Sequence, residues 1–302
     1  MKFFKNKKSF IVILIFIFIG FLYWKTGFLQ KNKIDEIDLK RWQYDEDGII
    51  VGAKEFTLDG KNDTCWYLIH GYSSTPNEMR ELANVVFSEF GETVVATRLK
   101  GSGEIPSHIL NLSLVDWYEQ ISDEFDVLSK QCKKVNLVGF SFGGALSVRL
   151  AENKQVNNTY LLSPYLFSTY KYYMVLRPEI YLDMFADFLN YSKKTKIGQI
   201  NSAEELKKHI AYWNMPFEPI KNSQSFLEEI KLNLNKIKSP VLLQHSENDM
   251  VSDVESSNYI YENISSEKKE IVIFEKSNHV ISEDYDKEDV FNNIINFEKN
   301  TR

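Results

Sequence analysis

The sequence lacks several features on which small secreted proteins, metalloproteins and nucleic-acid-binding proteins depend. Only two of its 302 residues are cysteines, Cys65 and Cys132, which is too few for a disulfide scaffold, and their spacing matches no metal site. The formal net charge is −6, so we expect no basic surface for nucleic acid. The chain has no His-Glu-x-x-His zinc motif, no P-loop and no internal repeat. We therefore expect a protein that uses neither a metal nor a cofactor.

What the chain does have is the composition of an ordinary globular protein. Hydrophobic residues make up 43% of it, aromatic residues 14% and charged residues 26%, so a buried core can form. A length of 302 residues suits one large α/β domain that carries an insertion, and it does not require two domains.

The N-terminal segment is strongly apolar. Residues Phe10 to Trp24 contain no charge and no proline, and they follow a start that is rich in lysine. Fifteen apolar residues are short against the ~20 that a spanning helix needs. Continuing to Leu29 adds the length at the cost of Lys25, whose stem can reach the headgroups. The bulky, aromatic end of the run disfavours cleavage as a signal peptide. We expect residues 1–29 to form an uncleaved membrane anchor, in which residues 10–29 contact the membrane, rather than a buried helix.

The orientation of this anchor is predicted from the lengths of the segments on its two sides. A very short N-terminus usually stays inside while a long C-terminal domain is exported, so we expect the remainder of the chain to be extracytoplasmic. Basic residues also follow the segment, which weakens the charge asymmetry: they are Lys25, Lys31, Lys33, Lys40 and Arg41. We expect residues 30–47 to form a polar linker and residues 48–302 to form the folded domain.

From residue 48 onward, short apolar runs alternate with amphipathic segments. The expected strands are Gly48 to Leu58, Cys65 to Ile69, Thr93 to Leu99, Val135 to Val138, Thr159 to Leu162, Pro240 to Gln244 and Glu270 to Phe274. Helices are expected from Thr75 to Phe90, Leu114 to Ser129, after Ser141, from Glu255 to Ile264 and from Lys287 to Phe297. This alternation predicts a mostly parallel sheet with helices on both faces.

The alternation is interrupted from about residue 167 to residue 237. This stretch is helical in pattern and rich in tyrosine and phenylalanine, without clear strands, so we expect a cap inserted into the domain. Its aromatic residues and their neighbours are Tyr165, Phe167, Tyr170, Tyr172, Tyr173, Met174, Tyr181, Met184, Phe185, Phe188, Tyr191, Tyr212, Trp213 and Phe217. A roof of this kind suits an apolar substrate, although most of these side chains are expected to pack within the cap itself.

Gly139-Phe140-Ser141-Phe142-Gly143 is a G-x-S-x-G motif between an expected strand and an expected helix. A sharp strand-to-helix turn crowds the backbone and leaves no room for side chains beside the serine, so the glycines are physically required. We expect Ser141 to be a nucleophile at the tip of the turn, and not an ordinary exposed turn residue.

A serine nucleophile needs donors for the oxyanion that develops on the substrate, and backbone N–H groups are fixed in place before the reaction. The N–H of Phe142, at the start of the helix, is one expected donor. The N–H of Tyr72, in the loop after the strand Cys65 to Ile69, is the other. His70 in this loop is expected to be a structural, hydrogen-bonding residue.

The acid and the base are chosen by chain order. In the fold for which the G-x-S-x-G turn is typical, the acid follows the nucleophile and the histidine comes last, after the final strand. Only His279 fits, because the other histidines lie too early or in the insertion: His70, His108, His209 and His245. Asp249, after the strand Pro240 to Gln244, is the expected acid, with Asp253 and Glu247 as alternatives. Its role would be to orient His279 and to stabilise the imidazolium.

From about Trp66 to its end, the chain resembles the bacterial carboxylesterase and monoacylglycerol lipase group of α/β hydrolases. The resemblance rests on HGYSST, RLKGSGEIP followed by DWYEQISDEFDVL, GFSFGGALS, SPVLLQHSENDMVSD and KSNHVISED. It implies the α/β-hydrolase fold, Ser141, Asp249 and His279 as a catalytic triad, and Tyr72 and Phe142 as oxyanion donors. The chain departs from the group's pattern at Ser102 and Asn278, in an insertion of about seventy residues and in the added membrane segment.

The resemblance implies hydrolysis of carboxylic esters, and a domain held at a bilayer would meet lipid-like esters such as monoacylglycerols or lysophospholipids. An amidase or peptidase on the same fold would share the triad, and a non-catalytic binding protein is the alternative from another class. Cys65 and Cys132 flank neighbouring strands, so either a disulfide or two buried thiols is compatible with the sequence. The oligomeric state is not predicted.

Overall fold

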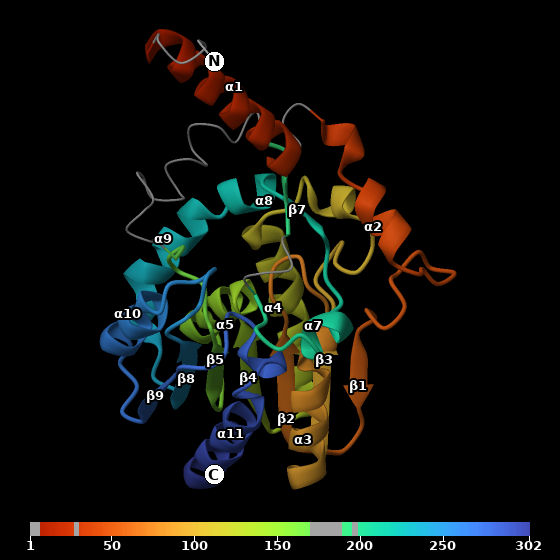
Figure 1. Ribbon diagram of the computed structural model, residues 1–302. Helices are drawn as coiled ribbons and strands as arrows, with labels where there is room; N and C mark the ends of the chain where they lie inside the picture. The colour runs from red at the N-terminus through yellow and green to blue at the C-terminus, as the bar shows by residue number, and fades with distance from the viewer. Residues whose placement is uncertain (1–6, 27–29, 170–188, 195–198) are drawn as a thin grey trace.

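The computed structural model describes residues 7–26, 30–169, 189–194 and 199–302, and its centre is a seven-stranded sheet (Figure 1). The strand order is β1-β3-β2-β4-β5-β8-β9, in which β1 runs antiparallel to β3 and all other neighbours are parallel. The strands are β1 (Phe56–Leu58), β2 (Lys61–Ile69), β3 (Glu92–Thr97), β4 (Lys134–Phe140), β5 (Thr159–Leu162), β8 (Val241–Ser246) and β9 (Lys269–Phe274). The predicted, mostly parallel α/β architecture is confirmed.

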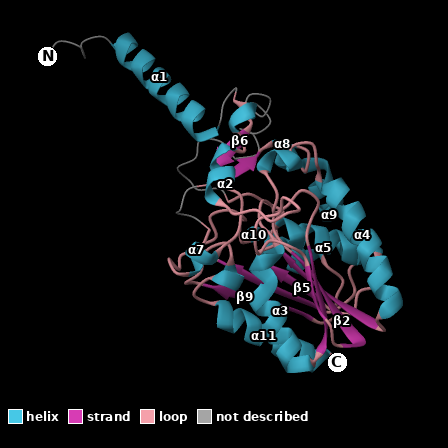
Figure 2. Ribbon diagram, turned by 90° about the vertical axis from the view of Figure 1, so that its right-hand side faces the viewer, coloured by secondary structure: helices cyan, strands magenta, loops and turns pink. Residues whose placement is uncertain are grey.

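Helices cover both faces of this sheet (Figure 2). One face packs against α3 (Arg80–Phe90) and α11 (Lys287–Thr301), and the other against α4 (Leu114–Gln131), α5 (Phe142–Asn153) and α10 (Glu255–Asn263). Because side chains alternate along a strand, Tyr67 of β2 lies in one core and Trp66 in the other. A strand buried on both faces is apolar at successive positions, which is why these strands appear as continuous hydrophobic runs.

The carboxyl ends of the parallel strands carry the loops of interest. β2 leads into His70 and Gly71, β4 into Ser141, β8 into the loop with Asp249, and β9 into the loop with His279. Since these strands are parallel, all of these loops lie at the same edge of the sheet. The topology therefore brings together groups that are up to 209 residues apart in sequence.

The insertion lies between β5 and β8, above this edge of the sheet (Figure 1). Its described elements are β6 (Tyr191–Lys193), α7 (Glu205–Lys208), β7 (Asn214–Pro216), α8 (Glu218–Lys221), α9 (Gln224–Asn233) and the 3₁₀ turn η4 (Leu234–Lys236). The expectation that it has no strands was wrong, because β6 and β7 form an antiparallel pair. Three-residue strands are too short to display a period of two, and Pro216 weakens the pattern further.

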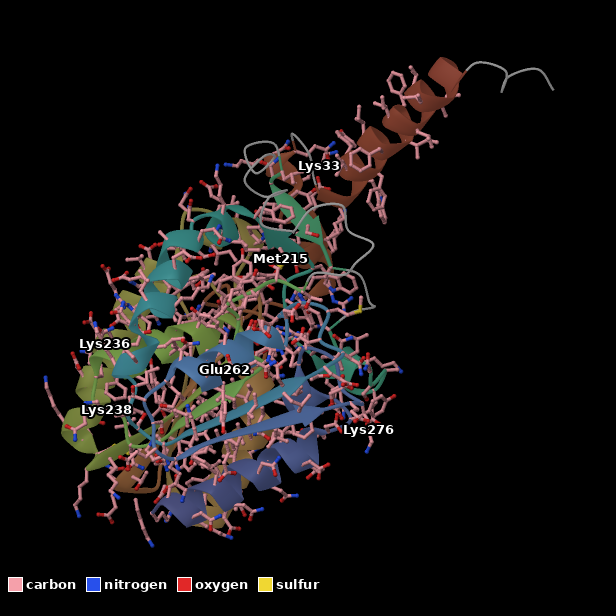
Figure 3. All side chains as sticks on the ribbon, turned by 90° about the vertical axis from the view of Figure 1, so that its left-hand side faces the viewer. Lys33, Met215, Lys236, Lys238, Glu262 and Lys276 are labelled. Carbon is pink, nitrogen blue, oxygen red and sulfur yellow. A yellow bond between two sulfur atoms is a disulfide. The ribbon has the colours of Figure 1, made fainter. Side chains whose placement is uncertain are left out.

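The apolar N-terminal residues form helix α1 (Lys7–Thr26), which projects from the folded domain (Figure 3). Its large apolar side chains from Ile11 to Phe21 are mostly exposed, with Phe16 at 69% and Ile17 at 62%. The prediction that residues 10–29 span a membrane is not supported: within the described ranges, no helix is both long and apolar enough to cross one. Residues 27–29 lie outside the described part of the chain.

The segment expected to be a polar linker, residues 30–47, packs against the cap. It contains the 3₁₀ turn η1 (Lys31–Lys33) and α2 (Glu36–Arg41), and Ile34 and Asp38 within it are buried. The Asp38 carboxylate accepts hydrogen bonds from the backbone N–H groups of Trp213 (2.7 Å) and Asn214 (3.1 Å). One buried carboxylate thus joins α2 to β7, and pattern analysis of a polar segment gives no sign of it.

Cys65 and Cys132 form a disulfide, the first of the two alternatives left open by the sequence. Their Cα atoms are 5.9 Å apart, because Cys65 lies in β2 and Cys132 directly precedes the neighbouring strand β4. The bridge closes a loop of 67 residues and joins β2 to the C-terminal end of α4 on one face of the sheet.

Candidate active site

Ser141 lies in the turn between β4 and α5. Its backbone has φ = 55° and ψ = −119°, a conformation that non-glycine residues rarely adopt. A Cβ atom on Gly139 would overlap the Ser147 hydroxyl, and one on Gly143 would overlap the backbone oxygens of Ile69 and His70. The two glycines therefore let α5 start directly against β2, which fixes Ser141 in its strained position.

The structure brings the three predicted residues into one hydrogen-bonded chain. The Ser141 hydroxyl lies 2.8 Å from His279 Nε2, and His279 Nδ1 lies 2.6 Å from Asp249 Oδ2. All three side chains are buried. A neutral imidazole protonated on Nδ1 satisfies both contacts, donating to the carboxylate and accepting from the hydroxyl. This is the geometry that a serine nucleophile and its general base require.

Asp249 is held ionised by the groups around it. Its Oδ1 accepts from the backbone N–H groups of Val251 (2.7 Å) and Ser252 (2.9 Å). Burial opposes ionisation, but the charge of His279 and hydrogen bonds from His279 and His245 outweigh it, so the pKa of Asp249 lies well below its usual range. The carboxylate therefore does not compete for the proton that His279 would carry.

The alternative acids do not reach the base. Asp253 Oδ1 instead accepts from the backbone N–H of Glu255 at 3.1 Å. Glu247 is exposed to solvent. Within the described residues, Asp249 is the carboxylate that contacts His279.

Two of the remaining histidines have structural partners. His70 Nδ1 donates to the Gly71 oxygen (2.8 Å) while Nε2 accepts from the Leu99 N–H (3.1 Å), and burial lowers the pKa of His70 to about 4. His70 is thus a neutral hydrogen-bonding residue, as the sequence suggested. His108 is exposed and pairs with Glu104.

Sequence reasoning missed the role of His245. Its Nε2 lies 3.2 Å from Asp249 Oδ2 and 3.1 Å from the Ser252 oxygen, while its Nδ1 lies 2.7 Å from the Ser257 hydroxyl. The side chain is fully buried. A histidine four residues before the acid, at the end of an apolar strand, was the only available sign of this contact.

Asn278 was also missed, because it was noted only as a departure from the family pattern. Its Oδ1 accepts from the backbone N–H groups of Met250 (3.1 Å) and His279 (2.9 Å). The family pattern has a glycine at this position, which would provide no side chain to join the two loops. The departure therefore ties the loop of the acid to the loop of the base.

The expected oxyanion donors have the required freedom. Within the described chain, neither the backbone N–H of Tyr72 nor that of Phe142 donates a hydrogen bond. The two rings pack edge to face at 5.5 Å, and both residues line the cavity that contains Ser141. Tyr72 is positioned by its hydroxyl, which donates to the Pro216 oxygen in the cap (2.6 Å).

Glu78 fixes the loop that carries Tyr72. Its two carboxylate oxygens accept from the Gly71 N–H and the Ser74 hydroxyl, each at 2.5 Å. Burial raises the pKa of Glu78 to about 7, although these hydrogen bonds and the charge of His209 act in the opposite direction. The loop that carries Tyr72 therefore rests on a carboxyl whose pKa lies near neutral pH.

The active-site cavity has a volume of about 240 Å³ and lies between the sheet edge and the cap. Most of its lining is apolar or aromatic: Tyr72, Phe140, Phe142, Tyr165, Met215, Phe217, Ile220, Met250, Val251 and Val280. Of the predicted roof residues, Tyr165 and Phe217 therefore contact this space, whereas Tyr191 and Tyr212 are buried elsewhere. Eight of the predicted roof residues lie outside the described part of the chain: Tyr170, Tyr172, Tyr173, Met174, Tyr181, Met184, Phe185 and Phe188.

Two bacterial enzymes are similar to this chain in sequence. A carboxylesterase of Bacillus subtilis (strain 168) is 24% identical over 251 residues, covering 82% of this chain and 97% of the relative. A thermostable monoacylglycerol lipase of Bacillus sp. (strain H-257) is 27% identical over 253 residues, covering 82% of this chain and 95% of the relative.

Solved structures show the same fold. A structure reported for LipS and LipT, two metagenome-derived lipolytic enzymes, superposes with a TM-score of 0.74 at 26% identity, over 83% of this chain and 99% of the other. The monoacylglycerol lipase of Paleococcus ferrophilus superposes with a TM-score of 0.70 at 19% identity, over 82% of this chain and 98% of the other. The α/β-hydrolase fold is thus confirmed.

The model of one family, described as serine aminopeptidase S33, matches residues 60–286. This range includes Ser141, Asp249 and His279 together with the loop of Tyr72, and it covers more than half of the chain. The chain therefore belongs to the serine aminopeptidase S33 family of α/β hydrolases.

Proposed function

We propose that this protein is a serine hydrolase of carboxylic esters, with Ser141 as nucleophile, His279 as general base and Asp249 as the acid that orients it. The observation that carries the proposal is the continuous contact from Ser141 through His279 to Asp249, at 2.8 and 2.6 Å, in the wall of a largely apolar cavity. The similarity to a carboxylesterase and a monoacylglycerol lipase supports an ester as the substrate.

In the proposed mechanism His279 Nε2 takes the Ser141 proton as the hydroxyl oxygen attacks the ester carbonyl. The resulting oxyanion accepts hydrogen bonds from two backbone N–H groups, that of Tyr72 in the loop after β2 and that of Phe142 at the N-terminus of α5. His279 then gives its proton to the departing alcohol, which leaves an acyl-enzyme on Ser141. A water molecule repeats the two steps and releases the carboxylic acid.

We propose lipid-like esters as the substrate class. The aromatic and aliphatic lining of the cavity suits an acyl chain, because such surfaces gain free energy when they exclude water. Exposed apolar side chains along α1 support attachment of the domain to a lipid surface, where such esters gather. The disulfide between Cys65 and Cys132 supports an oxidising, extracytoplasmic location for the domain.

The lipid-surface part of this proposal has its own test. Phospholipid vesicles are floated on a density gradient with the full chain or with the double variant Phe16→Lys, Phe18→Lys, both changes lying on exposed positions of α1. We expect the unaltered chain to float with the vesicles and the variant to remain at the bottom. Equal flotation of the two proteins would remove α1 as the attachment site.

An amidase or peptidase is the second candidate, because the matched family is described as a serine aminopeptidase. Both activities use the same nucleophile and base, so geometry alone does not separate them. The test is hydrolysis by the full chain of p-nitrophenyl esters of increasing acyl length beside aminoacyl p-nitroanilides. We expect esters to be cleaved at least tenfold faster. Faster cleavage of the anilides would favour the peptidase instead, and no turnover of either would favour a non-catalytic role.

A further inference from the structure

A second cavity lies beside the active site, between the cap and the N-terminal segment. It has a volume of about 310 Å³, and three of the residues that line it also line the active-site cavity: Lys194, Gln199 and His209. The two spaces therefore adjoin at these three residues, which are called the common wall below. This second cavity is called the cap pocket below.

The cap pocket is built by contacts between segments far apart in sequence. Asp38 accepts from the N–H of Trp213, which fixes α2 against the cap, and the Lys194 N–H donates to the Trp213 oxygen at 2.7 Å. The Arg41 guanidinium then lies over the Trp213 ring at 4.3 Å and over the Trp42 ring at 5.0 Å. A cation–π contact of this kind can hold a cation in place without using its N–H groups.

The described lining of the cap pocket is rich in cationic side chains. Arg41, Lys194 and Lys207 line it, and its described lining contains no aspartate or glutamate. Among the described residues, none of these three cationic groups makes a side-chain hydrogen bond or an ion pair. His209, in the common wall, is held by Glu283 at 2.6 Å.

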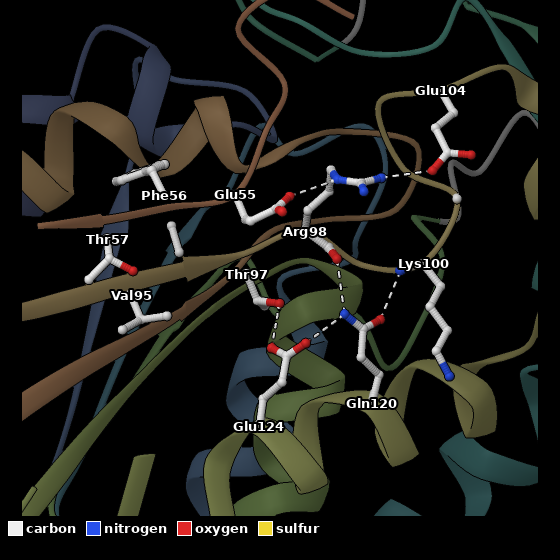
Figure 4. A pocket seen from close by; sticks show the side chains of 12 residues that line it. Glu55, Phe56, Thr57, Val95, Thr97, Arg98, Lys100, Glu104, Gln120 and Glu124 are labelled. Atoms are coloured by element: carbon white, nitrogen blue, oxygen red, sulfur yellow. Dashed lines mark hydrogen bonds and ion pairs between the residues drawn. The ribbon is translucent and has the colours of Figure 1, made fainter. Parts of the chain in front are cut away.

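A groove elsewhere on the described surface is organised in the opposite way (Figure 4). In that groove of about 590 Å³, near β1 and β3, the Arg98 guanidinium is held between Glu55 and Glu104, each at 2.9 Å. The third acidic residue of the groove, Glu124, accepts hydrogen bonds from the Thr97 hydroxyl and the Gln120 side-chain amide. The groove's guanidinium is thus paired with carboxylates of the groove itself, whereas the cations of the cap pocket point to an external partner.

Two buried carboxyl groups, Asp38 and Glu78, act electrostatically on these cations but form no direct ion pair with them. Both oxygens of Asp38 are taken up by backbone N–H groups, and Glu78 is occupied by Gly71 and Ser74. Burial lowers the pKa of Lys194 to about 8, despite the opposing effect of Glu78 and Asp38. At neutral pH most Lys194 side chains therefore remain protonated, and an anion in the pocket would favour that state further.

We propose that the cap pocket binds an anionic head group, such as a glycerol phosphate, on the alcohol side of the ester whose acyl chain occupies the active-site cavity. Lys194 would contact the anion from the common wall, and Arg41 and Lys207 would contact it from the exposed side. This inference rests on the proposed esterase function, and it narrows the substrate class from lipid-like esters to anionic ones.

The experiment compares two esters that differ only in the head group: 1-lauroylglycerol and 1-lauroylglycerol 3-phosphate, both below their critical micelle concentrations. We expect the full chain to hydrolyse the phosphate ester with at least a tenfold higher kcat/KM, because a charge-assisted hydrogen bond contributes about that factor. Added salt should reduce the preference by screening the exposed cations. Inorganic phosphate should act as a competitive inhibitor of the hydrolysis of the phosphate ester.

The variants Lys194→Gln and Arg41→Gln should each lower the ratio of kcat/KM for the phosphate ester to that for the neutral ester about tenfold. Lys208→Gln is the matched control, since Lys208 neighbours Lys207 but pairs with Glu204 and Glu205 away from the pocket. Its ratio should stay within twofold of the original. A preference for the neutral ester, or an unchanged ratio in both pocket variants, would overturn the inference. Failure to hydrolyse either ester would instead count against the proposed function.

Discussion

The active site and the cap pocket share a wall, yet they are built in different ways. Ser141, Asp249 and His279 follow the ends of parallel strands, so the sheet itself places them within hydrogen-bonding distance. Arg41 and Lys194 are brought together by the packing of an N-terminal helix on the cap. The sheet, which fixes the predicted reacting atoms, is thus separate from the cap and the N-terminal helix, where sequence changes would alter which substrate binds. This separation allows the same chemistry to act on many esters.

If this division is correct, the largest effects on turnover come from the strand-end residues. Asp249→Asn should lower kcat by about 10⁴, because an amide no longer holds the His279 tautomer that accepts the Ser141 proton. Asp253→Asn is the matched control, since the Asp253 carboxylate accepts a hydrogen bond from the Glu255 N–H at the start of α10. Steady-state kinetics on a p-nitrophenyl ester measures both. A larger loss in Asp253→Asn would move the acid to that position.

The disulfide between Cys65 and Cys132 should stabilise the scaffold without affecting the chemistry. Closing a loop of 67 residues lowers the entropy of the unfolded chain, which corresponds to about 4 kcal/mol of stability. We expect the double variant Cys65→Ala, Cys132→Ala to unfold at lower urea concentration and to keep its kcat when folded. An unchanged urea midpoint would mean that the bridge contributes nothing to the free energy of unfolding.

His245 offers a finer test of the strand-end site, because it contacts the acid and no substrate. His245→Leu removes a donor to Asp249 Oδ2, and the loss of such a bond is worth about 1.5 kcal/mol, or about tenfold in kcat. KM should change little. His245→Gln retains a donor group, so part of kcat should be recovered. Equal losses of kcat in the two variants, with a matching fall in the folded fraction, would indicate a purely structural role.

Glu78 lines the active-site cavity, and its substitution should change stability rather than turnover. Burial raises its pKa from 4.5 to about 7, so its contribution to stability is fully present below pH 4.5 and is lost as the pH rises through 7. In Glu78→Gln this loss is absent, because the amide does not titrate. We expect the Tm of the unaltered protein, relative to that of Glu78→Gln, to fall between pH 5 and pH 8. Parallel Tm curves across this range would contradict the raised pKa.

The same comparison explains what could be predicted from the sequence. Ser141 was predictable because its glycines are a steric requirement of one local turn. Asp249 and His279 were predictable because each lies in a loop that directly follows a recognisable strand, in the chain order expected of the fold. His245 and Glu78 were not, because their partners depend on side-chain packing between loops. Arg41 was counted only as a linker charge, since a polar segment gives no periodic sign that Asp38 binds the cap.

The central claim is that Ser141 is a nucleophile activated by His279, and a fluorophosphonate probe tests it directly. Treatment of the full chain should add one probe molecule, detected by intact mass analysis and mapped to the peptide that contains Ser141. Ser141→Ala should show no addition, while Ser147→Ala, the loss of a hydroxyl buried in the same helix, should label normally. No labelling of the unaltered protein, or labelling that persists in Ser141→Ala, would contradict the account.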